Sequence, residues 1–225
     1  MTLDHLQDRC LDYLSEVMAA DPAHDLSHVQ RVVQNTLNLT EAENGDAAVT
    51  VPAAWLHDCV SVAKDSPLRK QASKLAATEA VRFLESINYP ELLLAPIYHA
   101  IEAHSFSANI ATKSLEARIV QDADRLEAVG AIGITRCFLT GGSMGTPLYD
   151  PSDPFAENRE PDDGLYTLDH FYCKLLGLAE TMKTEAGKAE ALKRTEYMLA
   201  FLEQLGKEIG KTPGGHLCPP FGGIA

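Results

Sequence analysis

The spacing of apolar residues constrains this chain most, because it follows the helical repeat over almost the whole sequence. One apolar stripe contains Leu3, Leu6, Cys10, Leu14 and Val17. Side chains three or four residues apart lie on one face of an α-helix. No segment shows the sustained alternation of apolar and polar residues that marks a half-buried strand. The sequence therefore predicts an all-α protein.

Further segments with the same repeat predict the other helices, which we expect over residues 29–37, 47–58, 70–87, 91–104, 167–182 and 188–209. A longer helix is expected over residues 115–139, bent or broken near Gly130 or Gly133. The segment 141–166 is long and irregular. A loop of that length in a compact domain is usually functional or mobile, so it could act as a lid or a substrate-selecting wall.

The length and charge of the chain limit its organisation and partners. With 225 residues and no linker or fixed repeat, we expect one domain over 1–210 and a loose tail over 211–225, rich in Gly and Pro. A net charge of −13 disfavours a nucleic-acid polymer as partner. No run approaches the roughly 18 apolar residues of a membrane span. The start lacks the apolar core of a signal peptide and the five cysteines are scattered, so we expect a cytoplasmic protein with reduced thiols.

The doublet His57-Asp58 follows the apolar run VPAAWL at 51–56. Burying a charge without a partner is costly, and a metal ion would satisfy both side chains. His28, in HDLSHVQRV, and Asp122, in IVQDADRLEA, can supply two further ligands. Two imidazoles and two carboxylates without a thiolate favour Mn²⁺, Mg²⁺, Ni²⁺, Fe²⁺ or Co²⁺ over structural zinc. Four ligands also leave room for water and substrate on an octahedral ion.

Each of these residues also has a simpler interpretation. A lone histidine beside an apolar stripe, such as His28, is more often a hydrogen-bonded structural residue. Asp122 could equally be a helix cap or an ion-pair partner, and the doublet alone is a two-letter pattern. The combined spacing is more specific than any one member, because it would join three helices at one ion.

The motifs SHVQRV, WLHDCVSVAKDSP, AIEAHSFSA, EARIVQDADRLEAVGAIGITRCF and LDHFYCKLL resemble the HD superfamily of metal-dependent phosphohydrolases. The resemblance covers roughly residues 20–205 and is closest to small single-domain bacterial members, some of which are nucleotide pyrophosphohydrolases. It implies an HD-type helical bundle with His28, His57, Asp58 and Asp122 at the ligand positions. Some HD nucleotidases carry a glutamate three residues after the HD aspartate. This chain has Ser61 there, so that general-acid role does not transfer.

Three residues near these motifs are candidates for contacting a substrate. Lys64 follows His57 by seven residues and could bind phosphate, as the resemblance also implies, or be a solvated surface lysine. His104 matches a family motif position, and we expect it to contact phosphate or transfer a proton. Arg125 shares a helix face with Asp122, so it could contact phosphate or hold Asp122 in place.

Other polar residues are weaker candidates. Lys174 and His170 lie one turn apart and could face the pocket or lie on a helix surface. His99 lies about 140° from His104 around a helix, so we expect it to be structural. Asp124 and Glu127 add negative charge near the site, and the pair His24-Asp25 contains a candidate N-cap, Asp25.

These patterns predict an enzyme whose metal-activated water attacks a phosphate ester or anhydride, most simply of a nucleotide or deoxynucleotide. Asp58 would orient the water, while Lys64 and the ion would stabilise the developing charge. One alternative is a non-catalytic module in which the metal staples the helices and the pocket senses a nucleotide. Another is a purely structural helical protein without a metal. The G-x-S-x-G match at 141–145 is rejected, because a nucleophile elbow needs a strand before its serine.

Overall fold

A computed structural model describes residues 2–17, 26–62, 66, 68, 71–105 and 108–213. Within these ranges the chain is helical and contains no strand, which confirms the all-α prediction. The chain forms two compact units. The first comprises residues up to Asp124 together with Lys183–Gly187, and the second comprises Arg125–Met182 and the residues from Lys188 onward. The division into a domain over 1–210 and a tail over 211–225 stays a prediction.

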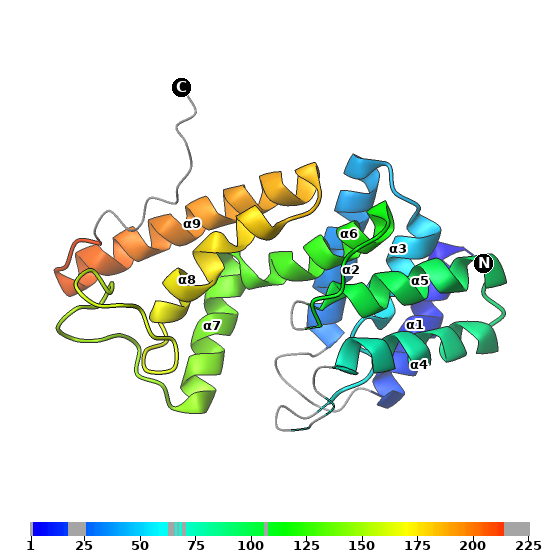
Figure 1. The fold of residues 1–225 in the computed structure, drawn as a ribbon, viewed down its shortest axis with the longest axis horizontal. Helices are drawn as coiled ribbons and strands as arrows, with labels where there is room; N and C mark the ends of the chain where they lie inside the picture. Colours follow the sequence, from blue (N-terminus) through cyan, green and yellow to red (C-terminus); the bar gives the residue numbers. More distant parts are fainter. Residues whose placement is uncertain are drawn as a thin grey trace. The chain divides into compact units, whose positions relative to one another are not determined.

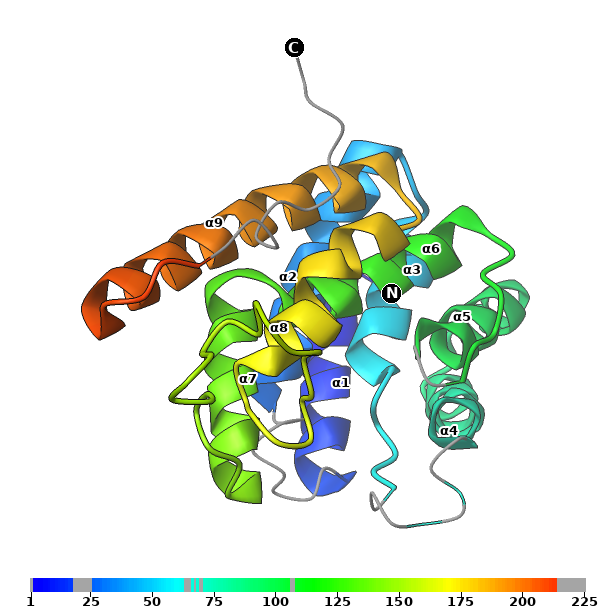
Figure 2. The same cartoon turned by 60° about the vertical axis from the view of Figure 1, so that its left-hand side comes forward.

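The first unit is built from six helices, the last of which ends at the boundary: α1 (Leu3–Val17), α2 (Leu26–Glu43), α3 (Ala47–Leu56), α4 (Ala72–Ser86), α5 (Glu91–His104) and α6 (Leu115–Arg125). Helix α3 packs against α1, α2, α4 and α5. Helices α4 and α5 lie side by side (Figures 1 and 2). Every helix in the described part of the chain is too short or too polar to span a lipid bilayer.

Helix α3 is the central, buried helix of the first unit. The Asp46 carboxylate caps its first turn by accepting the Ala48 N–H at 2.8 Å, and all residues from 49 to 56 are buried. A helix that is apolar on every side is stable only when it is surrounded. Pro52 cannot donate to the Ala48 carbonyl one turn earlier, and the Tyr89 hydroxyl donates to that oxygen instead, at 2.8 Å. The helix therefore remains continuous up to His57.

The second unit contains η2 (Leu126–Ala128), α7 (Gly130–Met144), α8 (Asp169–Cys173), η3 (Leu175–Thr181) and most of α9 (Glu185–Ile209). The break expected near Gly130 is confirmed, because Gly130 has φ +74°, a left-handed conformation that favours glycine. The single helix expected over 167–182 is instead α8 and η3, separated at Lys174 by φ −145° and ψ −56°.

Three phenylalanines join the helices of the second unit. The Phe138 ring on α7 lies 5.9 Å from those of Phe171 on α8 and Phe201 on α9, between ring centroids, and the latter two are 6.2 Å apart. Helix α7 continues to Met144, so the irregular segment begins later than the sequence predicted. Ser143 lies inside α7 and donates its hydroxyl to the Thr140 carbonyl. The G-x-S-x-G match is therefore part of a helix, consistent with its rejection.

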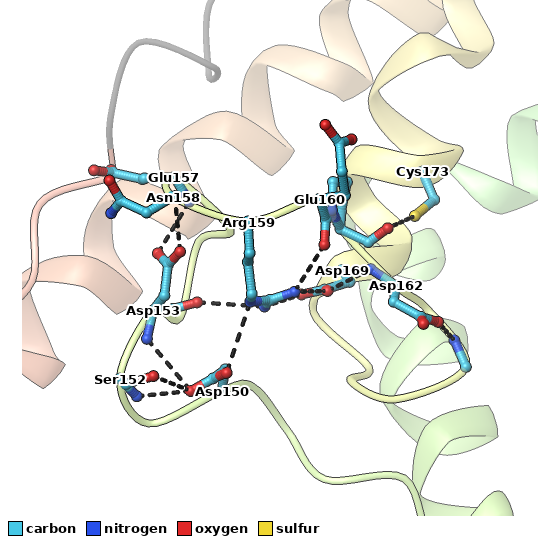
Figure 3. A network of polar contacts seen from close by, with 12 residues as sticks. Asp150, Ser152, Asp153, Glu157, Asn158, Arg159, Glu160, Asp162, Asp169 and Cys173 are labelled. Atoms are coloured by element: carbon cyan, nitrogen blue, oxygen red, sulfur yellow. Dashed lines mark hydrogen bonds and ion pairs between the residues drawn. The ribbon is translucent and has the colours of Figure 1, made fainter.

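The loop over residues 145–168, here called the acidic loop, is held by its own polar groups (Figure 3). The fully buried Asp169 accepts two N–H groups of the Arg159 guanidinium, one of them from Nη2 at 2.8 Å. Asp169 also accepts the Asp162 N–H at 2.7 Å. Arg159 lies over the Tyr166 ring at 4.9 Å and donates to the Asp153 carbonyl. The loop is therefore tied to the first residue of α8 by an ion pair between the part-buried Arg159 and the buried Asp169.

Candidate metal centre

His57 is the most buried member of the candidate centre. It follows α3 directly and is fully buried. Its Nδ1 lies 2.8 Å from the Ala54 carbonyl and must donate to it, so Nε2 carries the lone pair. Burial lowers the pKa of His57, and the neighbouring Asp58 carboxylate offsets this only in part. Nε2 has no hydrogen-bond partner among the described residues. This atom therefore presents a buried lone pair on a ring fixed from behind, an arrangement that suits a metal ligand.

His28 and Asp58 lie beside this nitrogen. His28 is a buried residue of α2, and its ring centroid is 5.4 Å from that of His57. Asp58 is half-buried, with Oδ2 at 3.6 Å from His57 Nε2. One ligand atom from each of the three residues lies within 4.8 Å of the other two. The arrangement brings together three of the four predicted ligands.

The fourth side chain at this point is Asp124. Its Oδ1 lies 3.5 Å from His28 Nε2 and 3.9 Å from His57 Nε2. Asp124 comes from the last turn of α6, so residues from α2, from the end of α3 and from α6 meet. The sequence marked Asp124 only as added negative charge near the site.

Asp122 has a different role in the described contacts. It is fully buried, and its carboxylate accepts the Lys183 N–H at 2.9 and 3.0 Å, the Thr184 N–H at 2.8 Å and the Thr184 hydroxyl at 2.7 Å. Residues two apart in a helix point about 200° apart, so Asp122 and Asp124 face opposite sides of α6. The geometry therefore favours Asp124 over Asp122 as the ligand, and it matches the alternative that Asp122 is a helix cap.

His104 also reaches the centre, from the last residue of α5. It is buried, and its Nδ1 lies 2.6 Å from the Ile101 carbonyl. Its Nε2 lies 3.5 Å from Asp58 Oδ1, so Asp58 lies beside both the His57 and His104 imidazoles, whose ring centroids are 4.9 Å apart. Burial disfavours the charged form of His104, but the Asp58 hydrogen bond and charge outweigh it and raise the pKa to about 8. His104 therefore shares the Asp58 carboxylate with His57, and its ring is fixed through Nδ1 by a backbone carbonyl.

The other substrate candidates have separate positions. Lys64, like His24 and Asp25, lies outside the described residues. Arg125 and Lys174 belong to the second unit, where Arg125 donates to the Thr181 carbonyl at 2.6 Å. Their roles in substrate binding stay predictions.

Two further histidines have local partners. His99 Nδ1 lies 3.1 Å from the Glu102 carboxylate, and its Nε2 accepts the Lys113 N–H at 3.0 Å. His170 Nδ1 lies 2.7 Å from the Asp163 carboxylate of the acidic loop. Both arrangements fit structural interpretations of these residues.

Comparison with known proteins identifies the family. The model of the HD domain matches residues 25–129, a range that holds the four side chains of the centre. A relative from Bacillus subtilis strain 168, the uncharacterized protein YpgQ, is 32% identical over 191 residues, covering 83% of this chain and 84% of the relative. The chain belongs to the HD-domain superfamily.

Several solved structures share the fold. An HD-superfamily hydrolase from Bacillus thuringiensis is 33% identical with a TM-score of 0.73, covering 93% of this chain and 99% of its own. B. subtilis YpgQ in complex with ADP is 29% identical with a TM-score of 0.69, covering 92% and 98%. A Lactobacillus plantarum protein is 30% identical with a TM-score of 0.68, covering 92% and 98%. The HD-type all-α fold implied by the motifs is thereby confirmed.

Proposed function

We propose that this HD protein is a metal-dependent phosphohydrolase acting on a small phosphorylated substrate, most simply a nucleotide or deoxynucleotide. The observation that carries the proposal is the buried Nε2 of His57, which faces the Asp58 and Asp124 carboxylates and has no hydrogen-bond partner among the described residues. A buried acceptor left unsatisfied is costly, and a bound cation removes that cost. The ADP complex of the relative YpgQ supports a nucleotide as the ligand.

The residues present fit a divalent cation. We assign His28, His57, Asp58 and Asp124 as its ligands, with Asp124 replacing Asp122 because the Asp122 carboxylate accepts the N–H groups that precede α9. Nitrogen and carboxylate ligands without a thiolate suit Mn²⁺, Mg²⁺, Ni²⁺, Fe²⁺ or Co²⁺. When bound, such an ion supplies Lewis acidity and lowers the pKa of a coordinated water.

The surrounding side chains supply the rest of the proposed chemistry. Asp58 is the half-buried carboxylate beside two imidazoles, so it can accept a hydrogen bond from the attacking water and orient it. His104 is fixed through Nδ1 and can present Nε2–H to a phosphate oxygen or to the leaving group. Lys64, Arg125 and Lys174 keep their predicted roles as contacts to substrate phosphate.

A nucleotide screen with product identification tests the proposal. Purified protein loaded in turn with Mn²⁺, Mg²⁺, Ni²⁺ and Co²⁺ is assayed against nucleoside mono-, di- and triphosphates. We expect metal-dependent release of pyrophosphate, orthophosphate or nucleoside, and the product identifies which bond is cleaved. Absence of product with every metal would contradict the enzyme assignment.

A second candidate is a nucleotide-sensing module in which the metal only joins the helices. The ADP complex of YpgQ also favours this role, since binding alone is what the complex records. Asp58→Ala separates the two candidates. Sensing is supported if the wild type binds nucleotide tightly without product release and the variant only melts at a lower temperature. Catalysis is supported if the variant loses turnover.

A further inference from the structure

We propose that residues 121–123 anchor α6 at three points and thereby aim Asp124 at the imidazoles, with Asp122 as the buried charged member of this anchor. The inference rests on the proposed function, because it concerns how the chain positions one of the assigned metal ligands. It makes Asp122 a positioning residue, distinct from the ligands themselves.

The Asp122 contact is the strongest of the three. Thr184 caps α9 by accepting the Gly187 N–H on its hydroxyl oxygen at 3.1 Å, and the same hydroxyl donates to Asp122 at 2.7 Å. The Lys183 and Thr184 N–H groups also donate to this carboxylate. The positive end of the helix dipole favours a carboxylate here. Asp122 therefore has both a charge-assisted hydrogen-bond set and complete burial.

The space around this cap allows little movement. A Cβ built on Gly187 would lie 2.6 Å from Asp122 Oδ2 and 2.6 Å from Thr184 Oγ1. Only glycine permits so close an approach of the α9 backbone to the carboxylate. Any rotation of α6 about its axis would take a buried carboxylate out of its donors, which is costly.

The residues on either side of Asp122 tie α6 to two other helices. The Gln121 amide donates to the Ala103 carbonyl at 2.7 Å, one residue before His104 on α5. The Asn35 amide donates to the Ala123 carbonyl at 3.2 Å, and Asn35 lies two turns after His28 on α2. Both contacts therefore join α6 to a helix that carries another histidine of the centre.

Together these contacts set the rotation and axial position of α6. A shift of one residue along the helix turns a side chain by about 100°, which would move Asp124 away from the His28 nitrogen that it now approaches at 3.5 Å. Asp124 itself is only partly buried, with 27% of its side chain exposed. The orientation comes from the neighbours of Asp124 in the chain, and Asp122 anchors them most strongly.

Substitutions at Thr184 test this without touching a ligand. Dissociation constants for Mn²⁺ are measured by electron paramagnetic resonance, and melting temperatures by calorimetry. We expect Thr184→Val to weaken Mn²⁺ binding about tenfold, the scale of a lost hydrogen bond behind a ligand. Thr184→Ser keeps the hydroxyl and should restore wild-type affinity. The matched control is Thr195→Val, because Thr195 is a buried residue of the same helix whose hydroxyl bonds the Ala191 carbonyl. The control should lower the melting temperature while leaving Mn²⁺ affinity unchanged.

Asparagine substitutions then separate the two aspartates. We expect Asp122→Asn to keep one Mn²⁺ per chain with about tenfold weaker affinity, and Asp124→Asn to lose affinity by more than about a hundredfold. Asp122→Asn combined with Thr184→Val should be little weaker than either single variant, since both remove one shared contact. The positioning role alone would be overturned if Asp122→Asn lost Mn²⁺ as completely as Asp124→Asn. It would also be overturned if Thr184→Val bound Mn²⁺ with wild-type affinity. A wild-type chain that binds no divalent cation would overturn the proposed function together with this inference.

Discussion

The candidate metal centre and the acidic loop both bring charged or ionisable side chains together, but these side chains differ in the partners that they have. In the acidic loop, Arg159 and the backbone N–H of Asp162 donate to the buried Asp169 carboxylate, so this carboxylate already has a cationic partner, although Arg159 Nε itself makes no hydrogen bond among the described residues. In the metal centre, His57 presents a buried nitrogen with no hydrogen-bond partner among the described residues. The difference teaches that a cluster of charges indicates a cation site when imidazoles and carboxylates meet at one point, and not when an arginine already pairs with the buried carboxylate. Richness in acidic residues alone does not indicate one.

The largest effect is expected from removing the unsatisfied nitrogen. His57→Ala should abolish stoichiometric Mn²⁺ binding and lower metal-dependent product release about a thousandfold, because several kcal/mol of charge stabilisation are lost. Elemental analysis and the product assay measure both. His99→Ala is the control, since His99 has local partners in Glu102 and the Lys113 N–H, and it should keep its metal. Full turnover in His57→Ala would remove the contrast between the two clusters.

Breaking the Arg159–Asp169 ion pair should cost stability and leave the metal in place. Arg159→Ala exposes the buried Asp169 carboxylate to an environment without its cation, so we expect the free energy of unfolding to fall by about 3 kcal/mol. Urea denaturation measures it. Lys193→Ala is the matched control, because the Lys193 ammonium is 78% exposed and 3.7 Å from Glu190, and such pairs contribute about 1 kcal/mol or less. Weaker Mn²⁺ binding in Arg159→Ala would show that the loop is more than structural.

Two helical glycines differ in the space around them, because Gly187 lies against Asp122 and a Cβ on Gly142 would contact no neighbouring side chain among the described residues. Gly187→Ala should destabilise the protein by about 1–3 kcal/mol, because the added methyl group overlaps the Asp122 carboxylate. Gly142→Ala in α7 should stabilise it by about 0.5–1 kcal/mol, since no described atom outside its own helix backbone lies within 4 Å of the added carbon. Thermal melting distinguishes the signs. Equal effects at the two positions would mean that the cap tolerates displacement.

The smallest effect is expected at the surface of the acidic loop. His170→Ala removes an imidazole that is 32% exposed and paired with Asp163, and exposed pairs contribute about 1 kcal/mol or less. We expect little change in melting temperature or Mn²⁺ affinity. A rise in KM for the nucleotide substrate with unchanged kcat would instead show that His170 faces the substrate, the other interpretation of its sequence position.

Local patterns predicted most of the fold, because helix boundaries depend on neighbouring residues. The apolar repeat predicted a helix over residues 91–104, which is the observed range of α5, Glu91–His104. The break near Gly130 was predicted from the glycine itself. The separation of α8 from η3 was not predictable. The repeat continues through Lys174, and only the backbone conformation of that residue interrupts the helix.

The site was predicted in part for the same reason. His28, His57, Asp58 and His104 were identified from motifs, and the structure brings them together. Local sequence could not show which of Asp122 and Asp124 faces the histidines. The helical repeat places the two aspartates on opposite faces of α6, but the N–H groups that bind Asp122 lie about sixty residues later, before α9. Likewise, the sequence showed a long loop but not that Arg159 reaches Asp169.

Because Tyr89 donates to the Ala48 carbonyl, the order in which Pro52 and Tyr89 are replaced during evolution should affect stability. While Pro52 is present, the tyrosine hydroxyl is the donor that replaces the missing helical N–H. Tyr89→Phe would then leave a half-buried carbonyl in the first turn of α3 without this donor. If Pro52→Ala came first, the restored N–H would serve that oxygen, whose two lone pairs can accept both donors. Lineages should therefore reach the alanine–phenylalanine pair through alanine first, and reconstructed ancestors carrying phenylalanine beside proline should be rare or poorly folded.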